Sequence, residues 1–341
     1  MSKTFREPKW AFNAIQVRQD GQIEKVGLSR VQHVRIEKYI AALEAAASST
    51  VANPIFSRYF VRESVIPTLG EIVPAGNIEY GFCQALHGEE AVMAAYRSRF
   101  GRSTQDVIIG IIAGSPGNIA TPCGNCRDIL LDDLGTDFEI VSGAADGGEA
   151  IVANMSHYLF SWFKTLSTIE IHPDLHNLIG LAIQHGDLLV NDAFSPKDVH
   201  PERRYHALIV TKVERFVGAH DVMCDYHPIY ALRDAIRQAR RKHDPFVQLV
   251  VIVCRGSGEI SPHVMYKDRQ HLLELNLQAE LLAKEENDPP VFLATYDDER
   301  KVTGLWQTSV KQWLPLPFTS RNFGQEHIES LAKYYKGLSD N

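Results

Sequence analysis

The sequence repeats itself at an offset of 140 residues, and this repeat constrains the fold more strongly than any other feature of the chain. An alignment without gaps places the apolar segment 107–112 on segment 247–252. Further aligned pairs are His87 with His227, Pro122 with Pro262, Cys123 with His263, Cys126 with Tyr266, Arg127 with Lys267 and Asp128 with Asp268. Identity between the repeats is low, but two unrelated domains would have to share one order of elements by chance. We therefore predict two similar domains in tandem.

The apolar segment Val107–Ile112 indicates the layers of each domain. Its sequence, VIIGII, is apolar on both faces of a strand, so it belongs inside a sheet that helices cover on both sides. Each repeat then ends with a strand, a turn and a second strand, around Asp146–Gly148 in the first repeat and Asp297–Asp298 in the second. The chain is thus predicted to be an α/β protein with two three-layer α-β-α domains, each with a mixed central sheet.

The same patterns set the expected domain boundaries, and a length of 341 residues suits two domains. Residues 1–47 are expected to form an N-terminal extension, with a strand at Trp10–Val17, a turn at Asp20–Gly21 and a helix at about Ser29–Ala47. The first domain is expected at 48–165, a linker at 166–184, the second domain at 185–320 and a tail at 321–341.

Charge and hydropathy disfavour several classes of function. The 35 lysine and arginine residues against 42 aspartate and glutamate residues give a net charge of −7, which offers no general attraction to nucleic acid or anionic lipid. The N-terminus lacks the apolar core of a signal peptide, and no apolar run reaches the length of a membrane span. We expect a cytoplasmic protein without membrane or nucleic-acid partners. The basic stretch from Arg233 to Lys242 is interpreted as a solvated helix face, with nucleic-acid contact as the alternative.

Two of the five cysteines, Cys123 and Cys126, stand close together. An odd number of cysteines without a secretion signal argues against a disulfide framework. With His87 the pair offers three zinc ligands and leaves the fourth tetrahedral position to water, as in catalytic rather than structural sites. The ligands are expected at helix N-termini, where amide hydrogens and the helix dipole stabilise thiolates. We predict one zinc ion per chain, in the first domain.

Glu89 follows His87 by two residues and is positioned to act as acid and base on a zinc-bound water. The pattern H-x-E … P-C-x-x-C is the zinc deaminase signature. Arg127, directly after Cys126, is expected to reduce the cost of two thiolates on one metal. The alternatives are a buried cysteine pair near an unrelated histidine, and Cys83 as a further ligand, although Cys83 is more ordinary as a small buried hydrophobe.

These motifs resemble the cytidine deaminase family, in its nucleoside branch. The resemblance spans nearly all of residues 48–165 and is best in GNIEYGF (76–82), HGEEA (87–91) and TPCGNCRDIL (121–130). It implies that Asn77 and Glu79 bind the ribose hydroxyls, whereas the alternative is a turn asparagine with a solvated glutamate. A weaker match at 52–61 implies that Tyr59 stands against the pyrimidine. Gly88, where the family has alanine, is expected to line the same substrate site.

The tandem arrangement is similar to the long, dimeric cytidine deaminases that have an altered C-terminal domain. In the second repeat Ile229 stands at the acid/base position and Tyr266 at a cysteine position, so we predict a domain without catalysis. His227 and His263 could still share a metal, but a structural remnant is the favoured interpretation. The resemblance implies a homodimer in which these domains help to close the pockets.

The predicted activity is hydrolytic deamination of cytidine, deoxycytidine or a closely related pyrimidine nucleoside to the uridine counterpart and ammonia, as in pyrimidine salvage. Gly88 and Asp128, which replaces the family's usual glutamine, leave a modified nucleoside or another aminopyrimidine as an alternative substrate. A deaminase that edits nucleic acid is a further alternative, based on the basic stretch 233–242. A zinc-stabilised scaffold without catalysis is the last.

Overall fold

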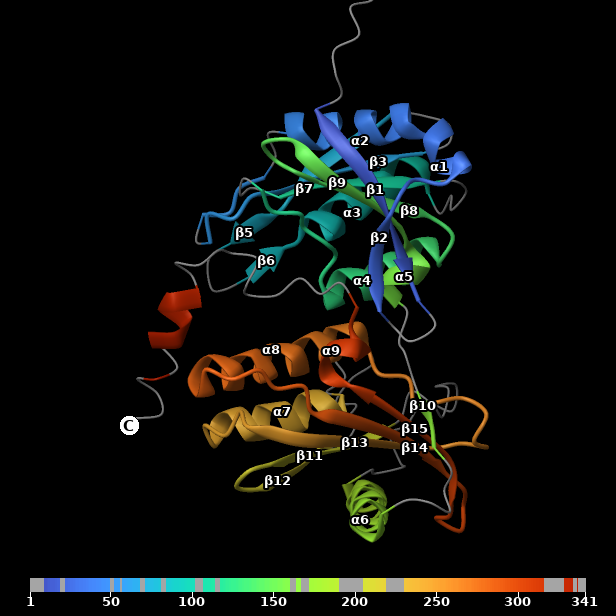
Figure 1. Cartoon of the computed structure of the whole chain (residues 1–341), viewed down its shortest axis with the longest axis vertical. Helices are drawn as coiled ribbons and strands as arrows, with labels where there is room; N and C mark the ends of the chain where they lie inside the picture. Colours follow the sequence, from blue (N-terminus) through green and yellow to red (C-terminus); the bar gives the residue numbers. More distant parts are fainter. Residues whose placement is uncertain are drawn as a thin grey trace, which may run out of the picture. The chain divides into compact units, whose positions relative to one another are not determined.

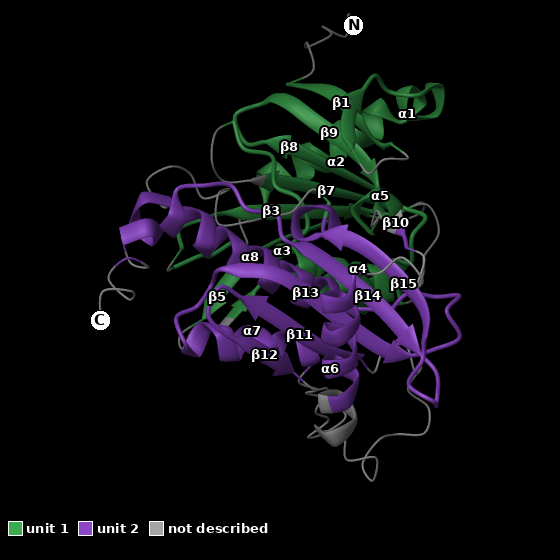
Figure 2. Ribbon diagram, turned by 60° about the horizontal axis from the view of Figure 1, so that its bottom comes forward, with its two compact units in different colours: residues 1–160, 315–324 green, residues 161–314, 325–341 purple. Residues whose placement is uncertain are grey.

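The structure, a computed structural model, describes residues 9–18, 22–49, 52–55, 57–67, 71–80, 84–101, 107–113, 117–159, 164–166, 172–189, 205–218, 230–315, 328–333 and 336. The chain divides into two compact units (Figure 2): unit 1 comprises Met1–Phe160 with Pro315–Gly324, and unit 2 comprises Ser161–Leu314 with Gln325–Asn341. Each unit has its own mixed sheet with helices on both faces (Figure 1). The predicted fold class, two three-layer α/β domains in tandem, is confirmed.

Unit 1 is built on a seven-stranded sheet in the order β2-β1-β9-β8-β7-β3-β4. Its strands are β1 (Trp10–Val17), β2 (Ile23–Val26), β3 (Val61–Ile66), β4 (Val73–Gly76), β7 (Ile108–Ala113), β8 (Glu139–Ala144) and β9 (Gly148–Asn154). Strand β7 lies parallel to β8 and antiparallel to β3. A separate hairpin, formed by β5 (Ile78–Tyr80) and β6 (Gln84–Leu86), leads into helix α3.

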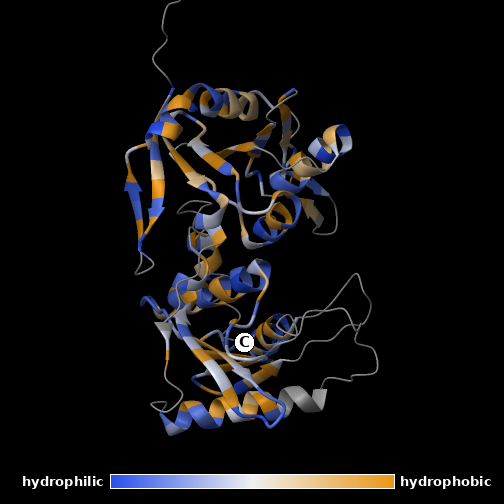
Figure 3. Cartoon of the chain, turned by 90° about the vertical axis from the view of Figure 1, so that its right-hand side faces the viewer, coloured by the Kyte–Doolittle hydropathy of each residue, from blue (hydrophilic) through white to orange (hydrophobic). Residues whose placement is uncertain are grey.

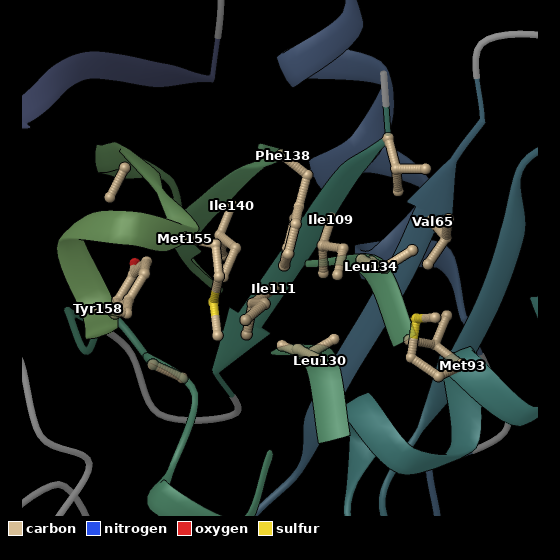
Figure 4. Close-up of a cluster of buried hydrophobic side chains, with 14 of the residues drawn as sticks. Val65, Met93, Ile109, Ile111, Leu130, Leu134, Phe138, Ile140, Met155 and Tyr158 are labelled. Carbon is tan, nitrogen blue, oxygen red and sulfur yellow. The ribbon is translucent and has the colours of Figure 1, made fainter. Parts of the chain in front are cut away.

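Helices cover both faces of this sheet because β7 is apolar on both faces. The helices of unit 1 are α1 (Arg30–Val34), α2 (Ile36–Ser48), α3 (Gly88–Phe100), α4 (Gly124–Leu134) and α5 (Met155–Leu159). Ile108 and Ile112 of β7 join a buried cluster with Leu43 of α2. Ile109 and Ile111 point the other way, into a second cluster that includes side chains of α3 and α4 (Figure 4). The predicted position of segment 107–112 inside a covered sheet is confirmed.

The segment that we predict as an N-terminal extension is part of unit 1. Strand β1 pairs in parallel with β9, and the indole nitrogen of Trp10 donates to the Ala144 carbonyl at 2.9 Å. The predicted helix is present in two parts: Ser29 and Gln32 form a capping box at the start of α1, and α2 begins after Arg35. The predicted turn at Asp20–Gly21 lies outside the described residues.

Unit 2 repeats five adjacent strands of the unit 1 sheet, from β9 to the edge strand β4. Its order β15-β14-β13-β11-β12 corresponds to β9-β8-β7-β3-β4, with the same parallel and antiparallel pairings, and β10 adds a short edge strand. The strands are β10 (Lys164–Thr165), β11 (Tyr205–Thr211), β12 (Arg215–Gly218), β13 (Val247–Arg255), β14 (Pro290–Tyr296) and β15 (Val302–Ser309). Hydrophobic residues run along the strands of both units (Figure 3). The repeat detected in the sequence is therefore a repeat of topology.

The helices of unit 2 are also equivalent to those of unit 1. They are α6 (Pro173–Leu189), α7 (Ala231–Arg241), α8 (Tyr266–Ala283) and α9 (Val310–Trp313). Helix α6 packs on β11 and β13, as α2 packs on β3 and β7, and buries Leu178 and Ile179 in the core of this unit. It covers most of the segment 166–184 that we predict as a linker, because these apolar residues lie on the sheet.

In the part of the chain that is described, no helix is long and apolar enough to span a bilayer.

A buried ion pair lies where α7 meets α8. Asp268 is fully buried, and its carboxylate accepts hydrogen bonds from Arg233 Nε at 2.8 Å and from the Tyr205 hydroxyl at 3.3 Å. Arg233 Nη2 lies 2.7 Å from the same carboxylate, and the Arg233 side chain is 26% exposed. A buried carboxylate needs such partners because its desolvation is costly. Arg233 therefore has a structural role rather than forming part of a solvated face.

We expect Arg233→Ala to lower the free energy of unfolding by about 3 kcal/mol, because it leaves Asp268 buried without its cation. Urea denaturation of the full chain measures this loss. Arg237→Ala, an exposed position on the same helix, is the matched control and should change stability by no more than about 0.5 kcal/mol. Equal effects of the two substitutions would contradict a role for Arg233 in the buried pair.

Candidate metal centre

Two helix N-termini bring His87, Cys123 and Cys126 together. His87 is the N-cap residue of α3, Cys123 is the N-cap residue of α4, and Cys126 lies in the first turn of α4. The His87 Nδ1 atom lies 3.3 Å from the sulfur of each cysteine, and the two sulfurs are 3.3 Å apart. Within the described ranges, these residues form the cluster that could hold a metal ion.

Glu90 holds the two helix starts in register. One of its carboxylate oxygens accepts from the His87 backbone N–H at 2.8 Å, and the other accepts from Asn125 Nδ2 at 2.8 Å. The first bond caps α3, and the second ties α3 to α4. Neither residue is assigned a role from the sequence, although an acid three residues after the N-cap position is a recognisable capping signal.

The electrostatics of the cluster favour negative charge at Cys123. The hydrogen bond from the Cys126 thiol is the main cause that holds the pKa of Cys123 well below that of an ordinary thiol. The hydrogen bond with Cys123 raises the pKa of His87 to about 9, and burial raises the pKa of Cys126. A thiolate at the start of a helix is a favourable metal ligand because the amide dipoles of the helix stabilise its charge.

Glu89 lies at the first turn of α3 and is 5% exposed. Burial raises the pKa of its carboxyl group, and the negative charge of Cys123 acts in the same direction. A carboxyl group whose pKa is raised toward neutrality is suited both to accept and to donate a proton.

A pocket of about 620 Å³, part of it open to solvent, lies over this cluster. Residues that line it are Ser57, Tyr59, Val61, Asn77, Glu79, Ala85, Leu86, His87, Gly88, Glu89, Ala120, Thr121 and Cys123. The structure therefore places His87, Glu89 and Cys123 in one pocket with Asn77, Glu79, Tyr59 and Gly88, while Cys126 and Arg127 are outside its lining.

Asn77 and Glu79 brace the segment that forms one wall of the pocket. The Asn77 side chain accepts from the Val61 N–H at 3.0 Å and donates to the Tyr59 carbonyl at 2.8 Å. Glu79 accepts from the Ser57 N–H at 2.9 Å. These bonds leave Asn77 a second amide hydrogen, and a carboxylate has several acceptor sites. Both residues can therefore hold the wall and still face a ligand.

Tyr59 and Gly88 affect the shape of the pocket because one has a large ring and the other has no side chain. Tyr59 is 6% exposed, and burial raises the pKa of its phenol to about 12, so the ring is neutral. A β-carbon added at Gly88 would lie 2.6 Å from Oε1 of Glu63. No side chain fits at position 88 unless Glu63 moves. Glu63, which is fully buried on β3, is a neighbour of the site that no sequence motif indicates.

Arg127 is fully buried and braces the backbone around α4. It donates from Nε to the Pro122 carbonyl at 2.9 Å, and from Nη1 to the carbonyls of Tyr158 at 2.8 Å and Pro315 at 2.6 Å. These bonds are directed at carbonyl oxygens. The structure thus supports a bracing role for Arg127, beside the charge-compensating role that we expect from its place after Cys126.

The equivalent positions in unit 2 differ from those of the ungapped alignment. The parallel ladder ends at Ala113 in β7 and at Arg255 in β13, and the next helices begin at Gly124 and Tyr266, an offset of 142 rather than 140. The bond from Arg127 Nε to Pro122 has its counterpart from Arg269 Nε to Val264, at the same 2.9 Å and the same offset.

The residues of unit 2 that stand at the candidate metal-ligand positions of unit 1 are therefore not the ones that the ungapped alignment indicates. The counterparts of Cys123 and Cys126 are Met265 and Asp268, not His263 and Tyr266. The helix start at His87 corresponds to that at Tyr230, the N-cap residue of α7. His227, Ile229 and Cys83 lie outside the described residues. The described positions offer no three-ligand cluster in unit 2, since Asp268 is engaged by Arg233.

No family model and no curated protein matches the chain. Among solved structures it is similar to a cytidine deaminase from Burkholderia pseudomallei, at 21% identity over 34% of this chain and 91% of that chain, with a TM-score of 0.31. The cytidine deaminase from Mycobacterium tuberculosis is 30% identical over 29% and 76%, with a TM-score of 0.25. That from Mycobacterium leprae is 23% identical over 35% and 91%, with a TM-score of 0.28. At such TM-scores these likenesses carry no weight for function.

We expect the purified chain to carry one metal ion, measured by inductively coupled plasma mass spectrometry. Cys123→Ala should abolish binding because it removes one of three ligands. The matched control is Cys254→Ala, which removes a buried thiol from β13 of unit 2 and should leave the metal content unchanged. Full metal content in Cys123→Ala would show that the ion binds elsewhere.

Proposed function

We propose that unit 1 is a zinc-dependent deaminase that converts cytidine, deoxycytidine or a closely related pyrimidine nucleoside to the uridine counterpart and ammonia. One observation carries the proposal: the His87, Cys123 and Cys126 ligand atoms converge at 3.3 Å, with Glu89 beside them in the same pocket. Three protein ligands, an adjacent acid and an accessible cavity are the parts that metal-assisted hydrolysis requires.

The ligand set fits zinc. Zinc bonds of about 2.3 Å to sulfur and about 2.0 Å to nitrogen, arranged as a tetrahedron, place two sulfurs about 3.8 Å apart and a sulfur and a nitrogen about 3.5 Å apart. The observed separations are slightly shorter, so a small outward movement of the side chains accommodates the ion. A bound zinc ion supplies the activation of water near neutral pH. We propose one ion per chain, held by His87, Cys123 and Cys126, since among the described residues the counterparts of both cysteines in unit 2 are not thiols.

Glu89 carries the protons of the reaction in this proposal. Its carboxylate accepts a proton from the attacking water and delivers it to the ring nitrogen, and the group then assists departure of the amine. A bond forms between the water oxygen and the ring carbon, the carbon–nitrogen bond breaks, and one ammonia leaves for each water consumed. The burial of Glu89 supports this role because a carboxyl group with a raised pKa exchanges protons readily.

The opposite wall of the pocket is suited to hold the sugar and the base. Asn77 and Glu79 offer hydrogen-bonding groups to ribose hydroxyls, and Tyr59 offers an aromatic face to the pyrimidine. Gly88 lines the pocket beside Glu89. These assignments rest on the position of the four residues in one pocket with the ligand cluster.

Two other activities remain candidates for test. The glycine at position 88 and Asp128 favour a modified nucleoside or another aminopyrimidine, and a substrate panel that includes cytidine separates these. Editing of nucleic acid is less well supported, because Arg233 of the basic stretch is engaged by Asp268.

We further propose a cytoplasmic homodimer in which unit 2 is a non-catalytic partner of unit 1. Light scattering measures the mass against 38.3 kDa per chain.

Glu89→Gln should lower kcat for cytidine by at least about a hundredfold, because an amide cannot exchange the proton. Loss of the cytosine ultraviolet band measures turnover. Metal content should stay at one ion per chain, since Glu89 is not a ligand. Glu44→Gln changes an exposed residue of α2 and is the control; it should leave kcat unchanged. Substantial turnover by Glu89→Gln would remove Glu89 from the mechanism.

Glu79→Gln should raise KM for cytidine by roughly tenfold, because a hydrogen bond to a charged acceptor is worth about 1.5–3 kcal/mol and an amide keeps only part of it. The amide oxygen can still accept from the Ser57 N–H, so the wall should stay in place. The control is a substrate: 2′,3′-dideoxycytidine lacks the hydroxyls, and its KM should not respond. A KM increase of the same size for both nucleosides would indicate damage to the wall instead.

A further inference from the structure

Glu63 is a buried acid that no part of the proposed mechanism uses. It lies on β3, is fully buried, and pairs across the sheet with Ala75 of β4 and Ile111 of β7. Within the described residues, neither of its carboxyl oxygens accepts a hydrogen bond from a nitrogen or hydroxyl donor. An unsatisfied buried carboxyl group is costly, so its presence needs a reason.

The Glu63 side chain is directed at the start of helix α3. A β-carbon added at Gly88 would lie 2.6 Å from Glu63 Oε1, 2.9 Å from Cδ and 3.2 Å from Cγ. The Glu63 carboxyl group therefore fills the space that a side chain at position 88 would occupy. This contact explains the glycine in HGEEA, since any larger residue would displace Glu63.

The polar group beside Glu63 is the Glu89 carboxyl group. After burial itself, the charge of Glu89 and a hydrogen bond with Glu89 raise the pKa of Glu63 most. Glu63 lies outside the pocket lining, whereas Glu89 is part of it. Two neighbouring buried carboxyl groups do not readily ionise together, so one of them can keep its proton and donate it to the other.

We propose that Glu63 is a positioning residue, which hydrogen-bonds the Glu89 carboxyl group from behind and holds it in the rotamer that faces the pocket, and that Gly88 is present to admit Glu63. The inference deepens the proposed function and rests on it for the role of Glu89. A glutamate side chain loses rotamer entropy on being fixed, so a neighbour that fixes it in advance favours the chemical step.

The first arm of the test is independent of activity. Gly88→Ala should lower the urea midpoint of the full chain, because the new methyl group meets Glu63. In a Glu63→Ala background the same change should raise the midpoint, because alanine is the better helix residue. A Glu63→Ala, Glu89→Ala double-mutant cycle should show a favourable coupling between the two acids. Additive effects in both cycles would overturn the inference.

The second arm measures positioning. Glu63→Ala should lower kcat for cytidine at least tenfold with little change in KM, and Glu63→Gln should restore most of kcat because its amide donates to Glu89. The matched control is Ser64→Ala, the adjacent buried polar residue of β3, whose hydroxyl donates to the Ala42 carbonyl at 2.7 Å. It should lower the urea midpoint and leave kcat unchanged. Metal content is measured for every variant.

The two arms separate failure of this inference from failure of the proposed function. A wild-type chain that is metal-loaded but inactive on every cytidine tested would refute the proposed function. The role of Glu63 in positioning an acid for that reaction would then also be refuted, even if the mutant cycles show coupling. An active wild-type chain with unchanged kcat in Glu63→Ala would refute only the positioning role. A loss in Glu63→Gln as large as in Glu63→Ala would also count against it.

Discussion

The hydrogen bonds of Glu90 connect the features on which the candidate site depends. A metal-ligand set drawn from two helices is useful only when both helix starts are fixed to within a fraction of an ångström. Glu90 achieves this by capping α3 at His87, one of the candidate ligands, and by holding Asn125, one of the two residues between the cysteines. The chain thus uses its capping interactions to set the geometry of the cluster as well as the ends of the helices.

Unit 2 shows what the same scaffold does with other residues at these positions. Asp268 stands at the position that Cys126 has in unit 1. Its carboxylate is paired with the Arg233 guanidinium of the neighbouring helix. At the junction of two helices, unit 1 brings together a histidine and two cysteines, and unit 2 brings together a carboxylate and a guanidinium. The two units therefore have the same packing of helices on a sheet, but the residues at this junction are suited to chemistry in unit 1 and to stability in unit 2.

The sequence predicts much of this architecture because its strongest signals are local. The apolar run 107–112, the paired strands at each repeat end and the spacing of His87, Glu89, Cys123 and Cys126 are all readable without the fold. The correspondence between repeats is wrong by two residues, because the parallel ladders match Ile108–Ala113 of β7 with Val250–Arg255 of β13, an offset of 142. A shift of two residues leaves each side chain on the same face of a strand, so the apolar pattern does not reveal it. The equivalence of Arg127 with Arg269 is visible only when their carbonyl partners are known. Glu63 is missed for a similar reason: its neighbours Gly88 and Glu89 are remote in sequence.

The bond from Arg127 to the Pro315 carbonyl has a consequence for how the protein is made. Pro315 belongs to unit 1 but follows Ser161–Leu314 of unit 2 along the chain, so most of unit 2 lies between two pieces of unit 1. A fully buried guanidinium next to the cysteine pair obtains one of its acceptors only after more than half of the chain has followed it from the ribosome. Unit 1 is thus started first but is completed only after most of unit 2 has been made, and a fragment that ends at residue 160 would leave this donor without that acceptor.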